Sequence, residues 1–168
     1  GEKVKGHPYS LELMFLGVLL HVTYNISLRG AAKALCAVSL LYGRTIKQVS
    51  ATTIRNWSLR LGLYFLTRPI KKGRYALIAD ESIAMGQEKL LVLLVVELDG
   101  SMSRTAPLQM SDMEILHLQS GRSWKGDDIS SIIREKAQEQ SIEIAYAISD
   151  KGSNLRNAFN KSGINWIG

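Results

Sequence analysis

Cysteine, histidine and long apolar runs are scarce in this sequence, and each scarcity excludes a class of protein. The only cysteine is Cys36, which excludes an internal disulfide framework and a zinc site made of cysteines alone. The three histidines show no metal-ligand spacing. The most apolar early stretch, residues 13–22, is shorter than the roughly 20 residues of a membrane-spanning helix, and no signal-peptide pattern precedes it. We therefore expect a cytoplasmic protein that has no membrane partner.

Acidic residues are nearly missing from the first part of the chain. Residues 1–74 hold 12 Lys and Arg but only 2 Asp and Glu, whereas residues 75–168 hold 9 Lys and Arg and 13 Asp and Glu. This shift predicts two modules, of which the basic first one would bind a polyanion, most commonly nucleic acid. The alternative is a solvated basic surface without a partner. Because 46% of the residues are hydrophobic and 21% are charged, both modules should be globular.

Three helices are predicted in the basic part, and each follows a side chain that can cap it. They are residues 11–25, 28–42 and 51–61, with caps at Ser10, Ser27, and Ser50 or Thr52. Residues 63–66 either continue the third helix or start a break. Gly43 ends the second helix, and Pro69 stops the third. The predicted domains are a helical module over residues 1–67, a basic linker over 68–74 and a second module over 75–168.

The third helix has the composition of a helix that reads DNA. Ile54 and Trp57 fall on one side with Ser58 and Leu61, whereas Arg55 and Asn56 fall opposite. Arg can pair with guanine and Asn with adenine, so the pattern favours a helix-turn-helix reader over an ordinary amphipathic helix. The candidate DNA contacts of this part share basic or hydrogen-bonding side chains. They are Arg29, Lys33, Arg44, Lys47, Thr52, Thr53, Arg55, Asn56, Arg60, Lys71, Lys72 and Arg74.

Two apolar runs in the second module each end in an aspartate, at Asp80 and at Asp150. Both runs have the length and composition of buried strands. If the strands are neighbours, their backbones lie roughly 4.8 Å apart and the two carboxylates can share divalent cations. The alternative is that each aspartate only caps the loop that follows it.

The remaining elements predict a mixed sheet with helices. Strands are expected over residues 75–80, 89–98, part of 101–119, 143–149 and 164–168, with a turn over 82–88 and a hairpin at residues 99–100. The run over residues 90–96 is apolar throughout, so we expect it to be buried on both faces. Asp127 and Asp128 begin a helix that returns the chain to a parallel strand. Trp124 is expected to be a packing residue.

This order of parts resembles a bacterial insertion-sequence transposase of the DDE type. The resemblance lies in five motifs: Ser27-Leu28-Arg29-Gly30-Ala31-Ala32, Thr53-Ile54-Arg55-Asn56-Trp57, Ile78-Ala79-Asp80-Glu81-Ser82, Gly121-Arg122-Ser123-Trp124 and Ser149-Asp150-Lys151-Gly152-Ser153-Asn154-Leu155-Arg156. It implies an α+β chain in which a helix-turn-helix-like domain precedes an incomplete ribonuclease-H-like sheet.

The resemblance also implies a chemistry. Asp80 and Asp150 would be the catalytic acids and would hold two Mg²⁺ ions about 4 Å apart, with Mn²⁺ as a substitute. The reaction would be cleavage and strand transfer of double-stranded DNA, at transposon ends and target, by a homodimer in the bacterial nucleoid. Lys151, Asn154 and Arg156 would contact DNA near the scissile phosphate, although solvated helix positions are an equal alternative.

The same resemblance requires a third acid on a later helix. No remaining acid matches that position, because Glu81 should point to the opposite face from Asp80. We therefore expect the third acid beyond Gly168 and little catalysis from these residues alone. Two alternatives stay open: a DNA-binding regulator or inactive truncated relative whose second module is structural, and a ribonuclease-H-like nuclease for another nucleic acid.

Overall fold

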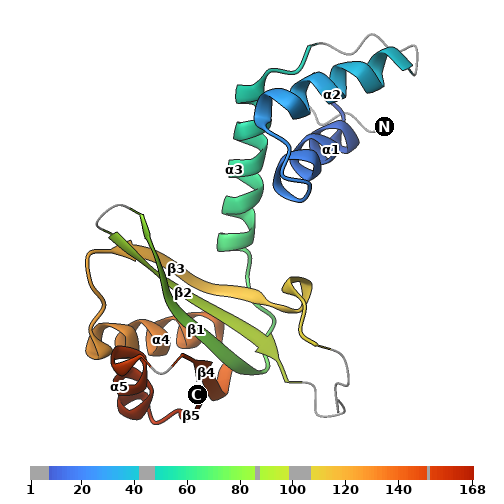
Figure 1. Ribbon diagram of the computed structural model, residues 1–168. Coiled ribbons are helices and arrows are strands. Elements are labelled where there is room, and N and C mark those ends of the chain that lie inside the picture. The colour runs from blue at the N-terminus through green and yellow to red at the C-terminus, as the bar shows by residue number, and fades with distance from the viewer. Residues whose placement is uncertain (1–7, 42–47, 86–87, 99–106, 151) are drawn as a thin grey trace. The chain divides into compact units, whose positions relative to one another are not determined.

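Helices come first along the chain, and a sheet with further helices follows (Figure 1). The computed structural model describes residues 8–41, 48–85, 88–98, 107–150 and 152–168. These residues form five α-helices, one short 3₁₀-helix and five strands. The chain divides into two compact units, residues 1–64 and 65–168. The mixed α and β architecture is compatible with a ribonuclease-H-like core in the second unit.

The first three helices begin at the predicted residues. They are α1 (Leu11–Val22), α2 (Leu28–Leu41) and α3 (Ala51–Thr67). The Ser10 Oγ accepts a hydrogen bond from the Leu13 amide at 3.4 Å, and the Ser27 Oγ accepts one from Gly30 at 3.1 Å. The Ser50 Oγ accepts from the Thr53 amide at 3.1 Å, so Ser50 and not Thr52 caps α3.

Residues 63–66, which the sequence left either as a continuation of the third helix or as a break, belong to α3. The helix continues past Leu61 to Thr67, because no proline or glycine C-cap interrupts the chain before Pro69. The predicted end of the second helix at Gly43, and the candidate contacts Arg44 and Lys47, lie outside the described residues.

A small core joins the helices of the first unit. Its buried members are Tyr9, Val18, Ala31, Leu35, Val49, Ile54 and Trp57. The ring of Tyr9 meets that of Trp57 edge to face at 5.2 Å between centroids. Gly17 is buried in α1, and a Cβ there would lie 3.2 Å from Leu35 Cδ1 and 3.3 Å from the Trp57 ring. The absent side chain therefore allows α1 to approach both residues closely.

The second unit is built on a five-stranded sheet with the order β3-β2-β1-β4-β5. The strands are β1 (Arg74–Met85), β2 (Glu88–Glu97), β3 (Glu114–Gly121), β4 (Glu143–Ser149) and β5 (Asn165–Ile167). β1 and β2 pair antiparallel, as do β2 and β3, whereas β4 runs parallel to β1 and to β5. The predicted parallel return of the fourth strand is confirmed.

Two details of the sheet differ from the predictions. The segment expected as a turn, residues 82–88, belongs largely to β1 and β2, which pair up to Met85 and Glu88. The strand left open between residues 101 and 119 begins at Glu114 and runs two residues further, to Gly121. The predicted hairpin at residues 99–100 lies outside the described residues. The long pairing of β1 with β2 explains the first difference, because cross-strand hydrogen bonds override the local turn signal.

Two helices, α4 (Gly126–Gln140) and α5 (Ser153–Ser162), pack on one face of the sheet (Figure 1). Leu91, Leu93 and Val95 face these helices and are fully buried, whereas Val92 and Leu94 point to the opposite face and are half-buried. On that opposite face Val96 is buried, but Leu90, Val92 and Leu94 are only half-buried. The prediction that the run over residues 90–96 is buried on both faces therefore holds fully for only one face.

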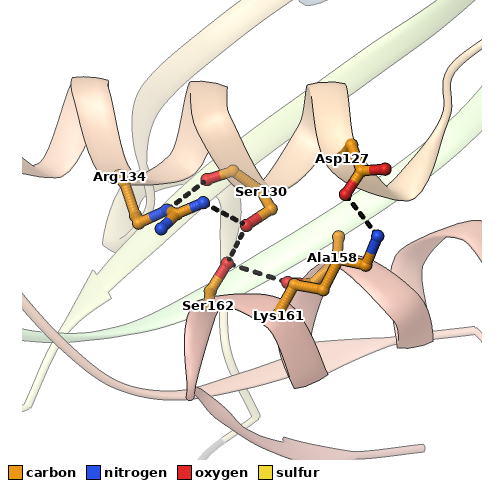
Figure 2. A network of polar contacts seen from close by, with 6 residues as sticks. All are labelled: Asp127, Ser130, Arg134, Ala158, Lys161 and Ser162. Atoms are coloured by element: carbon orange, nitrogen blue, oxygen red, sulfur yellow. Dashed lines mark hydrogen bonds and ion pairs between the residues drawn. The ribbon is translucent and has the colours of Figure 1, made fainter.

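The two helices of this layer are joined by a polar network (Figure 2). The Ser130 side chain is 1% exposed, and its Oγ lies 2.8 Å from the Ser162 Oγ. The Ser162 hydroxyl donates to the Ala158 carbonyl at 2.8 Å, and Lys161 pairs with Asp127 at the edge of the interface. Trp124 is buried in the core, as predicted for a packing residue.

Candidate functional site

Asp80 lies within β1 and not at its end as predicted. It is paired with Val92 of β2, and the strand continues beyond it. Side chains alternate along a strand, so Asp80 points away from the core that Leu77 and Ala79 enter, and its side chain is exposed. The carboxylate is thus presented on the face of the sheet opposite α4 and α5.

Asp150 follows the last residue of β4. Its Oδ1 accepts a hydrogen bond from the Gly152 amide at 3.1 Å, just before α5 begins at Ser153. A Cβ at Gly152 would lie 2.9 Å from the same oxygen, so glycine permits this close approach. Asp150 therefore has the loop-capping role that was the alternative interpretation.

The parallel pairing of β1 with β4 brings the two aspartates to adjoining strands. The last described pair of this ladder is Ala79 with Ser149; Asp80 follows Ala79 within β1, and Asp150 is the first residue after β4. Neighbouring strands are roughly 4.8 Å apart, which is a separation that a shared cation bridges. Two aspartates that are far apart in the sequence thus both follow the last residue pair of the β1–β4 ladder.

A third carboxylate, Glu81, interacts with both aspartates. Burial raises the pKa of Glu81 above its ordinary value, and the charges of Asp150 and Asp80 raise it further. A hydrogen bond from the Asn154 side chain and the charge of Lys89 oppose this increase. As expected from strand alternation, Glu81 is half-buried whereas Asp80 is exposed. In the part of the chain that the structure describes, no three His, Cys, Asp or Glu side chains form a group that could hold a metal ion.

Several candidate DNA contacts in the first unit share one exposed surface of α3. Arg55 and Asn56 are exposed, whereas Ile54 and Trp57 on the other side are buried. Among the other described candidates of α2 and α3, one side chain, that of Thr53, is half-buried. The exposed ones are Arg29 and Lys33 of α2, and Thr52 and Arg60 of α3. Thr53 Oγ1 lies 2.8 Å from the Ser50 Oγ, so its hydroxyl belongs to the cap of the helix.

The basic linker is more structured than the sequence suggests. Arg74 is the first residue of β1 and pairs with Glu143 at 3.4 Å, and Lys71 pairs with Glu97 at 3.0 Å. Lys72 is exposed, and the structure records no ion pair between it and a described residue. The three candidates therefore differ in how much of their charge is already offset by an acidic side chain.

The candidates after Asp150 have partners within the second unit. Asn154, in the first turn of α5, opposes the rise in the pKa of Glu81, and the Arg156 guanidinium lies 5.8 Å from the centre of the Trp166 ring. Lys151 lies outside the described residues. Sequence reasoning missed the influence of Asn154 and Asp150 on Glu81, because these residues belong to segments that are distant in the sequence.

Comparisons with known proteins identify no family. No protein-family model matches the chain, and no curated protein matches it. A chain in the cryoEM structure of a simian T-cell lymphotropic virus intasome in complex with the PP2A regulatory subunit B56 gamma aligns with a TM-score of 0.33 and 10% sequence identity. The alignment covers 90% of this chain and 51% of the other, so this chain spans about half the length of that neighbour. A likeness at this level supports no conclusion about fold or function.

The described helices are also too short or too polar to act as membrane spans. None of them combines the length and hydropathy that crossing a bilayer requires.

Proposed function

We propose that this chain is part of a DDE-type transposase, in which the first unit binds double-stranded DNA at transposon ends and the second supplies two metal-binding aspartates. The observation that carries the proposal is the placement of Asp80 and Asp150 directly after the last pair of the β1–β4 ladder. Both are exposed carboxylates, and carboxylate oxygens are the ligands that Mg²⁺ and Mn²⁺ prefer. The donor set therefore fits divalent cations.

Bound cations and the two aspartates would have different roles in the reaction. Bound cations would neutralise charge at a scissile phosphodiester and activate the attacking oxygen. Pairing with β2 holds the backbone of Asp80, and a hydrogen bond from the Gly152 amide holds the carboxylate of Asp150. A third acidic ligand would come from outside residues 1–168. The described residues alone would then bind metal weakly and catalyse little.

The first unit would recognise the DNA through α3 in a helix-turn-helix arrangement. Arg55 and Asn56 are the candidates for base contacts, because they are exposed opposite the buried Ile54 and Trp57. The basic residues of α2 and the linker would contact phosphates and add affinity without sequence preference. A homodimer on DNA, in a bacterial nucleoid, belongs to the same proposal.

A Mn²⁺ titration tests the metal site. We expect Asp80→Asn and Asp150→Asn each to weaken Mn²⁺ binding by about tenfold or more, because each removes one ligand. Asp128→Asn is a matched control, since it removes an exposed acid of α4. Electron paramagnetic resonance of free Mn²⁺ measures the affinity. Equal affinities for the wild type and the two site variants would refute the metal site.

A selection from random duplexes tests the DNA-binding proposal. The DNA sequence that the wild-type protein selects is then used to compare the binding of the wild type with that of Arg55→Ala and Asn56→Ala. Each lost base contact should cost about 1–3 kcal/mol on the selected sequence and relax the preference at one position. Arg122→Ala removes an exposed charge from the second unit and serves as the control. Unchanged selectivity in both α3 variants would exclude α3 as the reader.

A DNA-binding regulator with a structural second unit is the second candidate function. It is favoured by the finding that no three potential ligands form a metal-binding group among the described residues. It predicts sequence-selective DNA binding together with Mn²⁺ affinities that do not respond to Asp80→Asn. The two titrations above therefore separate the candidates.

A further inference from the structure

A tryptophan of β5 starts a chain of hydrogen bonds that ends at Asp150. The indole Nε1 of Trp166 donates to the Ser149 Oγ at 2.9 Å, and the Ser149 hydroxyl donates to the Asp150 carbonyl at 2.8 Å. All three residues belong to the second unit. The chain of hydrogen bonds therefore leads from β5, through the last residue of β4, to a proposed metal ligand.

The pairing of β4 with β5 explains how the indole reaches Ser149. Trp166 pairs with Ala147, which lies two residues before Ser149 on β4. Side chains two residues apart on a strand point to the same face and are separated by roughly 6.6 Å. Because Ala147 is buried in the core and Trp166 packs against that core, the indole lies on this face. Its length spans the distance along β4 to the serine.

The chemistry of the donors fixes the direction of both hydrogen bonds. An indole N–H can only donate, so the Ser149 oxygen accepts from Trp166 and its own hydrogen remains for the Asp150 carbonyl. A serine hydroxyl otherwise rotates to suit its surroundings. The ring of Trp166 is itself restrained by the Arg156 guanidinium, 5.8 Å from the ring centre. Trp166 therefore selects the hydroxyl orientation that restrains the backbone of Asp150.

Asp150 lies just beyond the described pairing of β4 with its neighbours. The pairs with β1 end at Ser149, and those with β5 end at Ile148. The Gly152 amide holds a carboxylate oxygen of Asp150 at 3.1 Å, whereas the hydroxyl of Ser149 holds its carbonyl. The two hydrogen bonds act on the side chain and on the backbone of the same residue, so together they restrict its orientation.

We infer that Trp166 is a positioning residue, which orients the proposed metal ligand Asp150 through the Ser149 hydroxyl. The inference rests on the proposed metal site and assigns a role to two residues that bind no cation themselves. Groups that orient the ligands of a metal tune its affinity without touching it. A phenylalanine would fill the same space beside the core but would offer no donor. The role therefore belongs to the indole nitrogen and not to the apolar ring.

The hydrogen bond can be tested without a metal. Each of the three tryptophans gives one indole signal in a proton–nitrogen correlation spectrum, and the Trp166 signal is identified by its loss in Trp166→Phe. We expect Ser149→Ala to shift this signal, because the substitution removes the acceptor. Ser131→Ala is the matched control, since it removes an exposed hydroxyl from α4 and should leave the signal in place.

The positioning role is measured as Mn²⁺ affinity on the full 168-residue chain, at a temperature where every variant is folded by circular dichroism. We expect Ser149→Ala to weaken Mn²⁺ binding about tenfold, which is the usual effect of losing an orienting group. Trp166→Phe should weaken it by less, because Ser149 keeps its hydrogen bond to Asp150. Ser149→Thr, which retains the hydroxyl, and Ser131→Ala should bind Mn²⁺ as the wild type does.

A double-mutant cycle distinguishes positioning from a general loss of structure. If Trp166 acts through Ser149, adding Trp166→Phe to Ser149→Ala should not weaken Mn²⁺ binding further. Effects that multiply would overturn the inference, as would an indole signal that Ser149→Ala does not shift. Wild-type affinity in Ser149→Ala, with Asp80→Asn still impaired, would overturn it while the metal site stands. No effect of Asp80→Asn would refute the metal site itself and the positioning role with it.

Discussion

At the scale of single residues, two glycines set how closely the helices of each unit pack. Gly17 lies in α1 of the first unit, where a Cβ would crowd Leu35 and Trp57. Gly126 begins α4 of the second unit, where a Cβ would lie 3.2 Å from the backbone nitrogen of Ala158. A flexible side chain can move aside, but a helix backbone cannot do so without repacking. The two positions should therefore differ in their tolerance of substitution.

The first prediction concerns Gly126. Gly126→Ala should destabilise the second unit by about 1–3 kcal/mol, because the added methyl group meets the backbone of α5. Gly62→Ala is the control, since Gly62 is an exposed position in α3 with nothing within 4 Å of an added Cβ. That variant should be stabilised by up to about 1 kcal/mol. Urea denaturation measures both, and a stabilised Gly126→Ala would contradict the packing described for α4 and α5.

The second prediction concerns the pH dependence of stability at Tyr75. Burial, together with the charge of Glu97, raises the pKa of Tyr75 above its ordinary value of 10.0. As the pH rises through 10, tyrosine in the unfolded chain loses its proton before the folded protein does. The unfolded state then binds fewer protons, so stability falls with increasing pH.

Tyr75→Phe separates this effect from the rest of the alkaline transition. The variant loses the 2.8 Å hydrogen bond to the Lys71 carbonyl and should be less stable by about 1 kcal/mol at neutral pH. That deficit should shrink at about pH 11, because phenylalanine does not titrate. Tyr24→Phe changes an exposed tyrosine and is the control. A deficit that stays constant with pH would show that Tyr75 does not contribute to the alkaline loss.

At the scale of elements, the pairing of α4 with α5 combines an apolar and a polar contact. Ile129 and Ile133 of α4 and Leu155 of α5 are buried in the core under the sheet. Ser130, between the isoleucines, is also buried, and its hydroxyl is satisfied by Ser162 and by the Arg134 guanidinium (Figure 2). A buried hydroxyl that lacked partners would cost free energy, so these hydrogen bonds specify how α5 lies on α4.

The third prediction compares the centre of that interface with its edge. Ser130→Ala should cost about 1 kcal/mol, because Ser162 keeps the Ala158 carbonyl as an acceptor while the other hydrogen bonds are lost. Lys161→Ala removes an exposed ion pair with Asp127 and should cost between zero and about 1 kcal/mol. Thermal unfolding of both variants gives the ranking. A larger loss for Lys161→Ala would mean that the edge and not the centre holds the helices together.

At the scale of the whole molecule, charge is divided between the two parts of the chain. Twelve of the 21 basic residues precede residue 75, whereas 13 of the 15 acidic residues follow residue 74. Some of the basic residues near the boundary pair with acids of the second unit, such as Arg68 with Glu114. The net charge of a segment therefore overstates the charge that it can offer to a phosphate backbone.

The fourth prediction follows from this difference and uses the salt dependence of DNA binding. Lys72→Ala should lower the slope of log K against log salt by about 0.9, the value for one phosphate contact. Lys71→Ala should lower it by less, because Glu97 already offsets the charge of Lys71. Fluorescence anisotropy with a labelled duplex at several salt concentrations measures both slopes. Equal slopes for the two variants would show that the Lys71–Glu97 pair does not persist on DNA.

Much of the fold could be predicted from the sequence because it depends on neighbouring residues. The serine caps, the first turns of the helices and the strand after α4 all follow from local hydrogen-bonding capacity and hydrophobic spacing. The continuation of β1 to Met85 could not, because its pairing with β2 extends the strand beyond its local signal. Boundaries of elements depend on the rest of the fold.

What the sequence by itself determined is therefore the identity and order of the elements, the division of charge and the two candidate aspartates. Only the tertiary structure decided that Asp80 lies inside a strand and that Asp150 directly follows the strand paired with it. The physical reason is the distance along the sequence over which each kind of interaction acts. Caps and periodicity act over a few neighbouring residues, whereas the meeting of two strands depends on burying apolar surface drawn from the whole unit.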